Sequence, residues 1–178
     1  AKAYLQTAMQ ELGLSEPPTL VLLSGDNPIS SVQSEWVQQS LKTTLGITVK
    51  IDKQIFKQRL AKMTAGDFDM VLAGWGPDYN DPLTFGDLYA SWNKNNRGEY
   101  NSQELDTLIE TAQNQLEPAV RMRAFGDIQQ HLIDNAVLLP MYERGVTYVV
   151  DPRIKQLTRR VIGPDPDWSR VYIDTGSE

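Results

Sequence analysis

Cysteine is missing from the 178 residues of the chain. Its absence excludes thiol catalysis, disulfide bonds and cysteine-ligated metal sites. A chain without cysteine can cross an oxidising compartment without pairing errors, although many cytosolic proteins lack cysteine as well. The composition therefore leaves both an exported and a cytosolic protein open.

Histidine is nearly missing too, which weakens any prediction of nucleophilic catalysis. The single histidine, His131, lies in a helical pattern, and no G-x-S-x-G motif is present to provide a nucleophilic serine. A lone helical histidine is most often a solvated surface residue, and this is what we expect of His131. The glycines form neither a phosphate-binding loop nor a dinucleotide fingerprint, so neither a cofactor nor a metal is predicted.

Basic residues are outnumbered, and long apolar runs are absent. The 17 Lys and Arg against 23 Asp and Glu give a formal net charge of −6, which argues against nucleic acid as a partner. No apolar stretch approaches the ~20 residues of a membrane span. The opening stretch, AKAYLQTAMQ, has the pattern of an amphipathic helix and not of a signal sequence. Either the protein is cytosolic or a leader has been removed.

The first half of the chain alternates between predicted helices and strands. A helix over residues 1–12 starts without a cap, from which we expect that the chain was cut from a longer one. Asn27 and Pro28 provide a cap and a first turn for the next helix, which ends at Gly46. Its apolar residues at helical spacing are Ile29, Val32, Trp36, Val37, Leu41 and Leu45.

Three apolar segments have the pattern of strands around these helices. They lie at 19–25, 47–52 and 68–74, with a further short helix at 54–65. Strand, helix, strand, helix, strand is the order of an α/β fold with a mostly parallel sheet and right-handed crossovers. In such sheets ligands bind beyond the carboxyl ends of the strands.

The second half adds two helices and a tail. Asn101, with Glu104 at capping-box spacing, opens one helix, and Pro118 opens the other. Residues 137–150 have the pattern of strand, turn and strand. We therefore predict a ligand-binding lobe at 1–150 and a C-terminal tail at 151–178. The tail ends in an extended piece at 171–173 without an evident partner, a second indication that part of the protein is missing.

The stretch FDMVLAGWGPDYNDPLTF, residues 68–85, contains the loop that follows the third predicted strand. Trp75 lies between Gly74 and Gly76, and glycines let a ligand or another backbone approach closely. A tryptophan that simply packs in the core at the end of a strand is the ordinary alternative. The position of the loop favours the wall of a ligand-binding cleft.

Polar and aromatic groups fill the same loop. Tyr79, like Tyr89 farther along, fits either a site or the core. Asp78 and Asp81 could form a carboxylate pair for acid–base chemistry, but aspartate beside proline is most often a turn former. An EF-hand calcium loop is excluded because Pro82 comes early in it and its twelfth position holds Tyr89 instead of glutamate.

At this loop the sequence resembles a known family. FDMVLAGWGPDYNDPLTFGDLY, followed by YNSQELDTLIETAQ, is similar to the second-lobe region of extracytoplasmic oligopeptide-binding proteins, the solute receptors of peptide-importing ABC transporters. The similarity covers essentially the whole chain, and its specific part is the G-W-x-x-D-Y-x-D-P core. It implies one lobe of a type II periplasmic-binding-protein architecture, with the other lobe absent from this chain.

The resemblance also implies how a ligand would be held. In such receptors an extended peptide pairs its backbone with the segment that matches Gly74, Trp75 and Gly76, which is β-augmentation. The carboxylate matching Asp78 pairs with the N-terminal ammonium of the peptide, a charge-assisted contact of ~1.5–3 kcal/mol. Trp75 and Tyr79 would form the walls of a side-chain pocket.

Two positions depart from the family. Enterobacterial-type members carry basic residues in the strand before the motif and in the helix before that strand, where this sequence has Leu72 and Met63. The contacts of those cations, and with them the preferred peptide length, stay open. As a replacement for holding the peptide carboxylate we expect the helix that opens at Asn27 and Pro28, with Ser30 and Ser31 in its first turn.

The resemblance implies a non-enzymatic, extracytoplasmic receptor, either periplasmic or anchored by lipid at the outer face of the cell membrane. Its partners would be an oligopeptide, the membrane permease of an ABC transporter and the missing N-terminal lobe. Two alternatives remain: a related receptor for a dipeptide, a sugar or a metal chelate, and a hydrolase that uses Asp78 and Asp81. Asp78 favours a ligand with an ammonium group, because a neutral sugar has none to pair.

Overall fold

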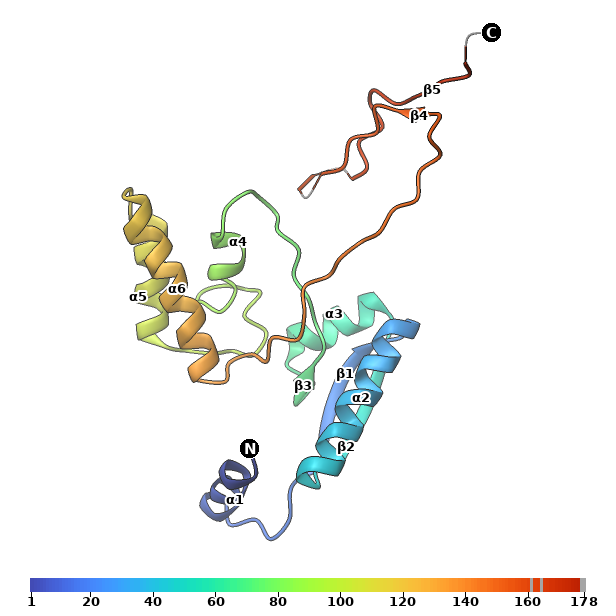
Figure 1. Ribbon diagram of the computed structural model, residues 1–178. Helices are drawn as coiled ribbons and strands as arrows, with labels where there is room; N and C mark the ends of the chain where they lie inside the picture. Colours follow the sequence, from blue (N-terminus) through green and yellow to red (C-terminus); the bar gives the residue numbers. More distant parts are fainter. Residues whose placement is uncertain (161, 164, 177–178) are drawn as a thin grey trace. The chain divides into compact units, whose positions relative to one another are not determined.

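The computed structural model describes residues 1–160, 162–163 and 165–176, so positions 161, 164 and 177–178 of the predicted tail lie outside the described residues. The chain forms two compact units, Ala1–Gly74 and Trp75–Glu178 (Figure 1). Their boundary falls inside the glycine-flanked loop that the sequence singles out. The lobe and tail divided at residue 150 stay a prediction.

A three-stranded parallel sheet forms the centre of the first unit. Its strands are β1 (Leu20–Gly25), β2 (Val49–Gln54) and β3 (Met70–Val71), in the order β2-β1-β3. β3 is shorter than predicted, but the pairing continues where the Leu72 N–H donates to the Leu23 carbonyl at 3.0 Å. The predicted α/β fold with a mostly parallel sheet is confirmed.

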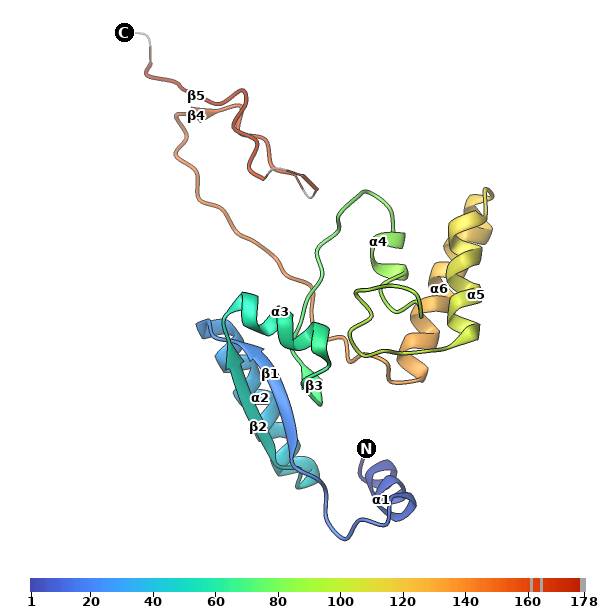
Figure 2. The same cartoon turned by 180° about the vertical axis from the view of Figure 1, so that it is seen from behind.

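Two helices cover the sheet. They are α2 (Pro28–Leu45) and α3 (Phe56–Ala65). The connection from β1 to β2 and the connection from β2 to β3 run in opposite directions across the sheet, so right-handed crossovers place the helices on opposite faces. Figure 1 shows the α2 side, and the reverse view in Figure 2 shows the sheet in front of that helix.

The start of α2 is built as the sequence predicts. The Asn27 side chain accepts the Ser30 N–H at 2.9 Å, Pro28 occupies the first turn, and Gly46 ends the helix with a φ of 73°. Gly25 is needed beside this cap, because a Cβ there would lie 2.9 Å from the Ser30 hydroxyl oxygen. Ser30 therefore lies next to the carboxyl end of β1.

The apolar face predicted for α2 is only half correct. Val37, Leu41 and Leu45 pack against the core of the sheet, whose buried members are Leu22, Ile47 and Val49. Ile29, Val32 and Trp36 are instead exposed, by 68%, 68% and 63%. The helix is rotated so that small side chains face β1: Ser34 is fully buried, and the Ser30 carbonyl accepts the Ser24 hydroxyl at 3.3 Å.

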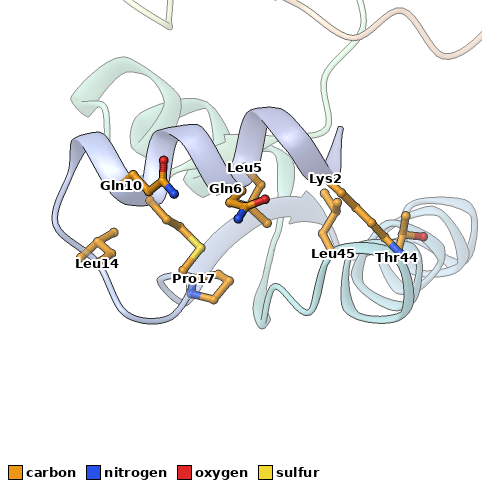
Figure 3. Close-up of a pocket in the computed structure, with 9 residues that line it drawn as sticks. Lys2, Leu5, Gln6, Gln10, Leu14, Pro17, Thr44 and Leu45 are labelled. Carbon is orange, nitrogen blue, oxygen red and sulfur yellow. The ribbon is translucent and has the colours of Figure 1, made fainter.

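An open groove of about 340 Å³ lies between α1 (Lys2–Glu11) and the last turn of α2. Leu5, Leu14, Pro17 and Leu45 point into it in Figure 3. Because α2 runs antiparallel to the strands, the groove lies at the amino edge of the sheet. No predicted site residue lines it.

The second unit has a helical core. Its helices are α4 (Leu83–Gly86), α5 (Gln103–Asn114) and α6 (Pro118–Asp134). The cap of α5 is Ser102, whose hydroxyl accepts the Leu105 N–H at 3.3 Å, so the prediction of Asn101 with a Glu104 capping box is wrong by one residue. The buried core consists of Ala90, Leu105, Ile109, Ala112, Ala124, Phe125, Ile128 and Leu132.

The C-terminal part of this unit differs from the prediction. Residues 138–150 contain no strand, and Leu139, Val146 and Val149 are exposed by 82%, 68% and 99%. An alternating pattern forms a strand only where a partner strand accepts its hydrogen bonds. The extended piece at 171–173, for which the sequence shows no evident partner, has one, because β5 (Tyr172–Ile173) pairs antiparallel with β4 (Ile154–Lys155). No helix in the described part of the chain is long and apolar enough to cross a membrane.

Candidate ligand-binding site

The exit from β3 is tied to α3 before the first unit ends. The Leu72 carbonyl accepts a hydrogen bond from Arg59 Nη1 at 2.8 Å, and the guanidinium lies 5.8 Å from the centre of the Phe56 ring. Arg59 Nε is buried and has no partner among the described residues. The sequence pattern did not single out Arg59, because no short-range motif links a helical arginine to a backbone carbonyl in a following strand.

Ser30 lies at the same edge of the sheet, and its N–H and hydroxyl oxygen are bound by Asn27. Its N–H donates to Asn27 Oδ1, and its hydroxyl oxygen accepts from Asn27 Nδ2, both at 2.9 Å. Pro28 brings no N–H. The Ser30 hydroxyl oxygen is the acceptor in its bond with Asn27, so its O–H hydrogen stays available to a ligand carboxylate.

The loop that opens the second unit exposes both of its aromatic rings. Trp75 is 40% exposed and Tyr79 is 44% exposed. Within the described residues, no backbone–backbone hydrogen bond involves Gly74, Trp75 or Gly76. A Cβ built on Gly76 would meet nothing within 4 Å. The backbone of this segment is therefore open to pairing with another extended chain.

Thr84 in α4 holds the part of the loop that contains Trp75 and Asp78. Its side-chain oxygen accepts the Asp78 N–H at 3.0 Å and lies 3.5 Å from Trp75 Nε1, at the long end of hydrogen bonding. Thr84 is only 3% exposed. The Asp78 side chain is exposed, and no described residue donates a hydrogen bond to its carboxylate or forms an ion pair with it. The backbone of Asp78 is thus fixed while its charge is free.

Asp81 has the opposite surroundings. Its two oxygens accept from Arg121 Nη1 and Nη2 at 2.7 Å each, and one of them also accepts the Leu83 N–H at 2.9 Å. These bonds lower the pKa of Asp81, with the Arg121 guanidinium as the main cause. Arg121 belongs to α6 and lies 5.0 Å from the centre of the Phe125 ring. Its bonds to Asp81 therefore fasten the loop to α6. The sequence pattern of the loop does not reveal Arg121, because it is 40 residues away from Asp81 along the chain.

The two tyrosines separate into a core residue and a loop residue. Tyr89 packs against the helical core, and burial raises the pKa of its hydroxyl. Tyr79 stays half exposed, and partial burial is the main reason that its pKa is raised. The carboxylates that add to this shift belong to Asp87, Asp81 and Asp78. The Arg121 guanidinium opposes this shift, and because it binds Asp81, the nearby carboxylate without a described partner is that of Asp78.

The prediction that His131 is a solvated surface residue is wrong. Only 8% of its side chain is exposed. Its Nε2 lies 2.9 Å from the Tyr100 hydroxyl and 3.3 Å from the Ser102 hydroxyl, while Nδ1 lies 3.6 Å from Glu104 Oε2. Because Ser102 also caps α5, this cluster joins the start of α5 to α6.

Comparison of the chain with protein families and with known proteins agrees with the resemblance seen in the sequence. Residues 1–97 match the model of the middle part of the bacterial extracellular solute-binding proteins, family 5. The dipeptide-binding protein DppE of Bacillus subtilis is 27% identical over 163 residues, which are 92% of this chain and 30% of that protein.

Solved structures give the same result. The substrate-binding domain of an oligopeptide ABC transporter from Bacillus anthracis matches with a TM-score of 0.87 and 29% identity, over 97% of this chain and 34% of that one. OppA of Listeria monocytogenes, solved with a bound peptide, matches with a TM-score of 0.84 and 30% identity, over 97% of this chain and 33% of that one. The chain thus spans about a third of the length of these relatives.

Proposed function

Because this chain belongs to the bacterial extracellular solute-binding proteins of family 5, we propose that it is the part of a peptide receptor that holds the amino end of an extended peptide. In this proposal the backbone of Gly74, Trp75 and Gly76 pairs with the peptide backbone. Asp78 binds the N-terminal ammonium group. Trp75 and Tyr79 line a pocket for a peptide side chain.

One observation carries the proposal: the Asp78 carboxylate has no described partner, although the loop around it is fixed. Thr84 accepts the Asp78 N–H, and Asp81 fastens the loop to Arg121. A charge held in place without a partner can bind a ligand cation without first breaking an internal ion pair. Relatives named for dipeptide and oligopeptide binding support a ligand with a free amine.

The competing functions fit the loop less well. A neutral sugar has no cation for the Asp78 carboxylate, whereas a dipeptide has one and stays within the proposal. A hydrolase would need Asp81 as an acid or base, but both Asp81 oxygens are occupied by Arg121. We therefore expect binding without turnover. Ser30 is left as a weaker candidate for the peptide carboxylate, because its N–H already serves the Asn27 cap and only its hydroxyl hydrogen stays available.

The complete protein would act outside the cytoplasm and deliver peptide to the permease of an ABC transporter. Its second lobe would lie in the part of the receptor that this chain does not include, as the relatives are about three times longer. It would be free in the periplasm or attached by a lipid to the outer face of the membrane. No cofactor is part of the proposal.

The test uses the complete receptor with Trp75 as its reporter. Every other tryptophan of the complete receptor is replaced with Phe. Within this chain these are Trp36, Trp92 and Trp168, which are exposed by 63%, 50% and 61%, so their replacement should leave the fold intact. A panel of dipeptides, longer peptides and neutral sugars is then titrated, with product analysis for hydrolysis. We expect peptides alone to change the Trp75 emission, without cleavage. A response to sugars alone, or cleavage of a peptide or glycoside, would refute the proposal.

A further inference from the structure

We infer that Thr84 is a positioning residue for the ligand loop, an inference that rests on the proposed function. Its hydroxyl oxygen is the one described side-chain atom that bonds to both Trp75 and Asp78. Thr84 is 3% exposed, so it does not itself reach a ligand. It acts through the two residues that do.

The loop needs such a support because it has no regular backbone pairing. Residues 74–82 form neither helix nor strand, so side chains must fix their course. Asp81 fixes the far end through Arg121 and the Leu83 N–H. At the near end, Thr84 is the one described side chain that forms hydrogen bonds with Trp75 and Asp78. Loss of the Thr84 hydroxyl should therefore loosen the ligand-binding end while the Asp81 end stays in place.

Threonine suits position 84 because its hydroxyl can accept two hydrogen bonds at a buried place. A hydroxyl oxygen has two acceptor lone pairs, enough for the Asp78 N–H and the Trp75 indole N–H together. α4 has four residues, of which Thr84 and Gly86 are buried. Gly86 lets the helix approach α6 closely, since a Cβ there would lie 3.0 Å from Phe125 Cε1. The core of the second unit thus holds the Thr84 hydroxyl in place.

The decisive pair of variants is Thr84→Val and Thr84→Ser in the complete receptor that keeps only Trp75. Valine preserves the shape and removes the acceptor, whereas serine keeps the acceptor. We expect Thr84→Val to weaken peptide binding roughly three- to tenfold, as loss of one hydrogen bond would. In the ligand-free receptor it should also raise the quenching of Trp75 by iodide. Thr84→Ser should restore both. Thr84→Cys, whose sulfur is a weak acceptor, should fall between them and serves if the valine variant does not fold.

Ser34→Ala is the matched control. Ser34 is also a fully buried hydroxyl, which donates to the Ser31 carbonyl at 3.0 Å in α2. Its loss should lower the melting temperature without changing the Trp75 signal. If Thr84→Val lowers the melting temperature as Ser34→Ala does and leaves affinity and quenching unchanged, Thr84 is only structural and the inference is wrong. Failure of the wild-type receptor to bind any peptide would instead refute the proposed function, while the quenching of Trp75 would still report on Thr84.

Discussion

Asp78 and Asp81 lie three positions apart in one loop, yet their carboxylates have different roles in the structure. Asp81 is bound on both oxygens by Arg121, whereas Asp78 has no described side-chain partner. Identical residue types in one turn therefore divide into an anchor for the loop and a free charge. This difference depends on α6, which supplies Arg121 from a distant part of the chain.

The two aspartates should respond differently to the same substitution. Asp81→Asn removes the charge that Arg121 binds and should lower the melting temperature at pH 7 by about 2–4 °C. Asp78→Asn, its matched control, should leave it unchanged. Because the pKa of Asp81 is lowered from 3.8, its contribution is present above that pH and is lost as the pH falls further. The difference between the variants should therefore shrink in acid. Equal melting temperatures at pH 7 in differential scanning calorimetry would contradict the assignment.

At the scale of elements, two arginine–aspartate contacts lie in the segment that connects β4 to β5. Arg159 forms an ion pair with Asp165, and Arg160 donates to Asp167 at 2.7 Å. The Arg159 guanidinium also lies over the Tyr148 ring. Each strand has only two residues, so the backbone pairing of this ribbon is short, and we expect these side-chain contacts to add to its stability.

The pH dependence of the ribbon follows from these contacts. Hydrogen bonds from Arg159 are the main cause that lowers the pKa of Asp165 from 3.8 to about 2. Because this pKa is lowered, the ionised Asp165 carboxylate stabilises the fold above about pH 4, and this stabilisation is lost as the pH falls through about 2. We expect Arg159→Gln to return the Asp165 pKa toward 3.8. Asp167, whose pKa of about 2 depends chiefly on Ser169, should change little. Carboxyl-carbon NMR titrations check this, and an Asp165 pKa near 3.8 in the wild-type chain would contradict it.

Elements that depend on neighbouring residues could be predicted from the sequence, and those that depend on distant ones could not. Asn27, Pro28 and Gly46 specify α2 locally, and the structure keeps all three roles. The rotation of α2 could not be predicted, because Ile29, Val32 and Trp36 are as apolar as the residues that face the sheet. The burial of His131 could not be predicted for a similar reason, because its partner Tyr100 is 31 residues away along the chain.

The candidate loop shows the same limit. Its place after the third strand follows from the rule for parallel sheets, and the loop motif follows from the family resemblance. The supports of the loop, Thr84 and Arg121, carry no local signature. A buried threonine and a helical arginine acquire these roles only when α4 and α6 pack together. Sequence reasoning could therefore find the residues proposed to touch a ligand but not those that hold them.

At the scale of the whole molecule, the chain covers about a third of its relatives. In the proposal, the remainder of the receptor encloses the other side of the peptide. A peptide bound by one lobe alone stays partly in water, and its contacts must still offset an association cost of ~4–15 kcal/mol. The isolated chain should therefore bind peptide at least about a hundredfold more weakly than the complete receptor. Equal affinities of the two proteins for one peptide would show that this chain holds the whole site.

The most direct measurement compares six affinities by titration calorimetry, those of three forms of the complete receptor for two peptides. Wild type and Asp78→Asn are each titrated with one peptide in its free-amine and N-acetylated forms, with Asp127→Asn as an exposed charge control. We expect Asp78→Asn to weaken binding of the free-amine peptide about ten- to a hundredfold. Binding of the acetylated peptide, which carries no charge for Asp78 to bind, should change little, and Asp127→Asn should change the binding of neither peptide. Equal losses for both peptides in Asp78→Asn, or no loss for either, would contradict the role of Asp78 as the amine anchor.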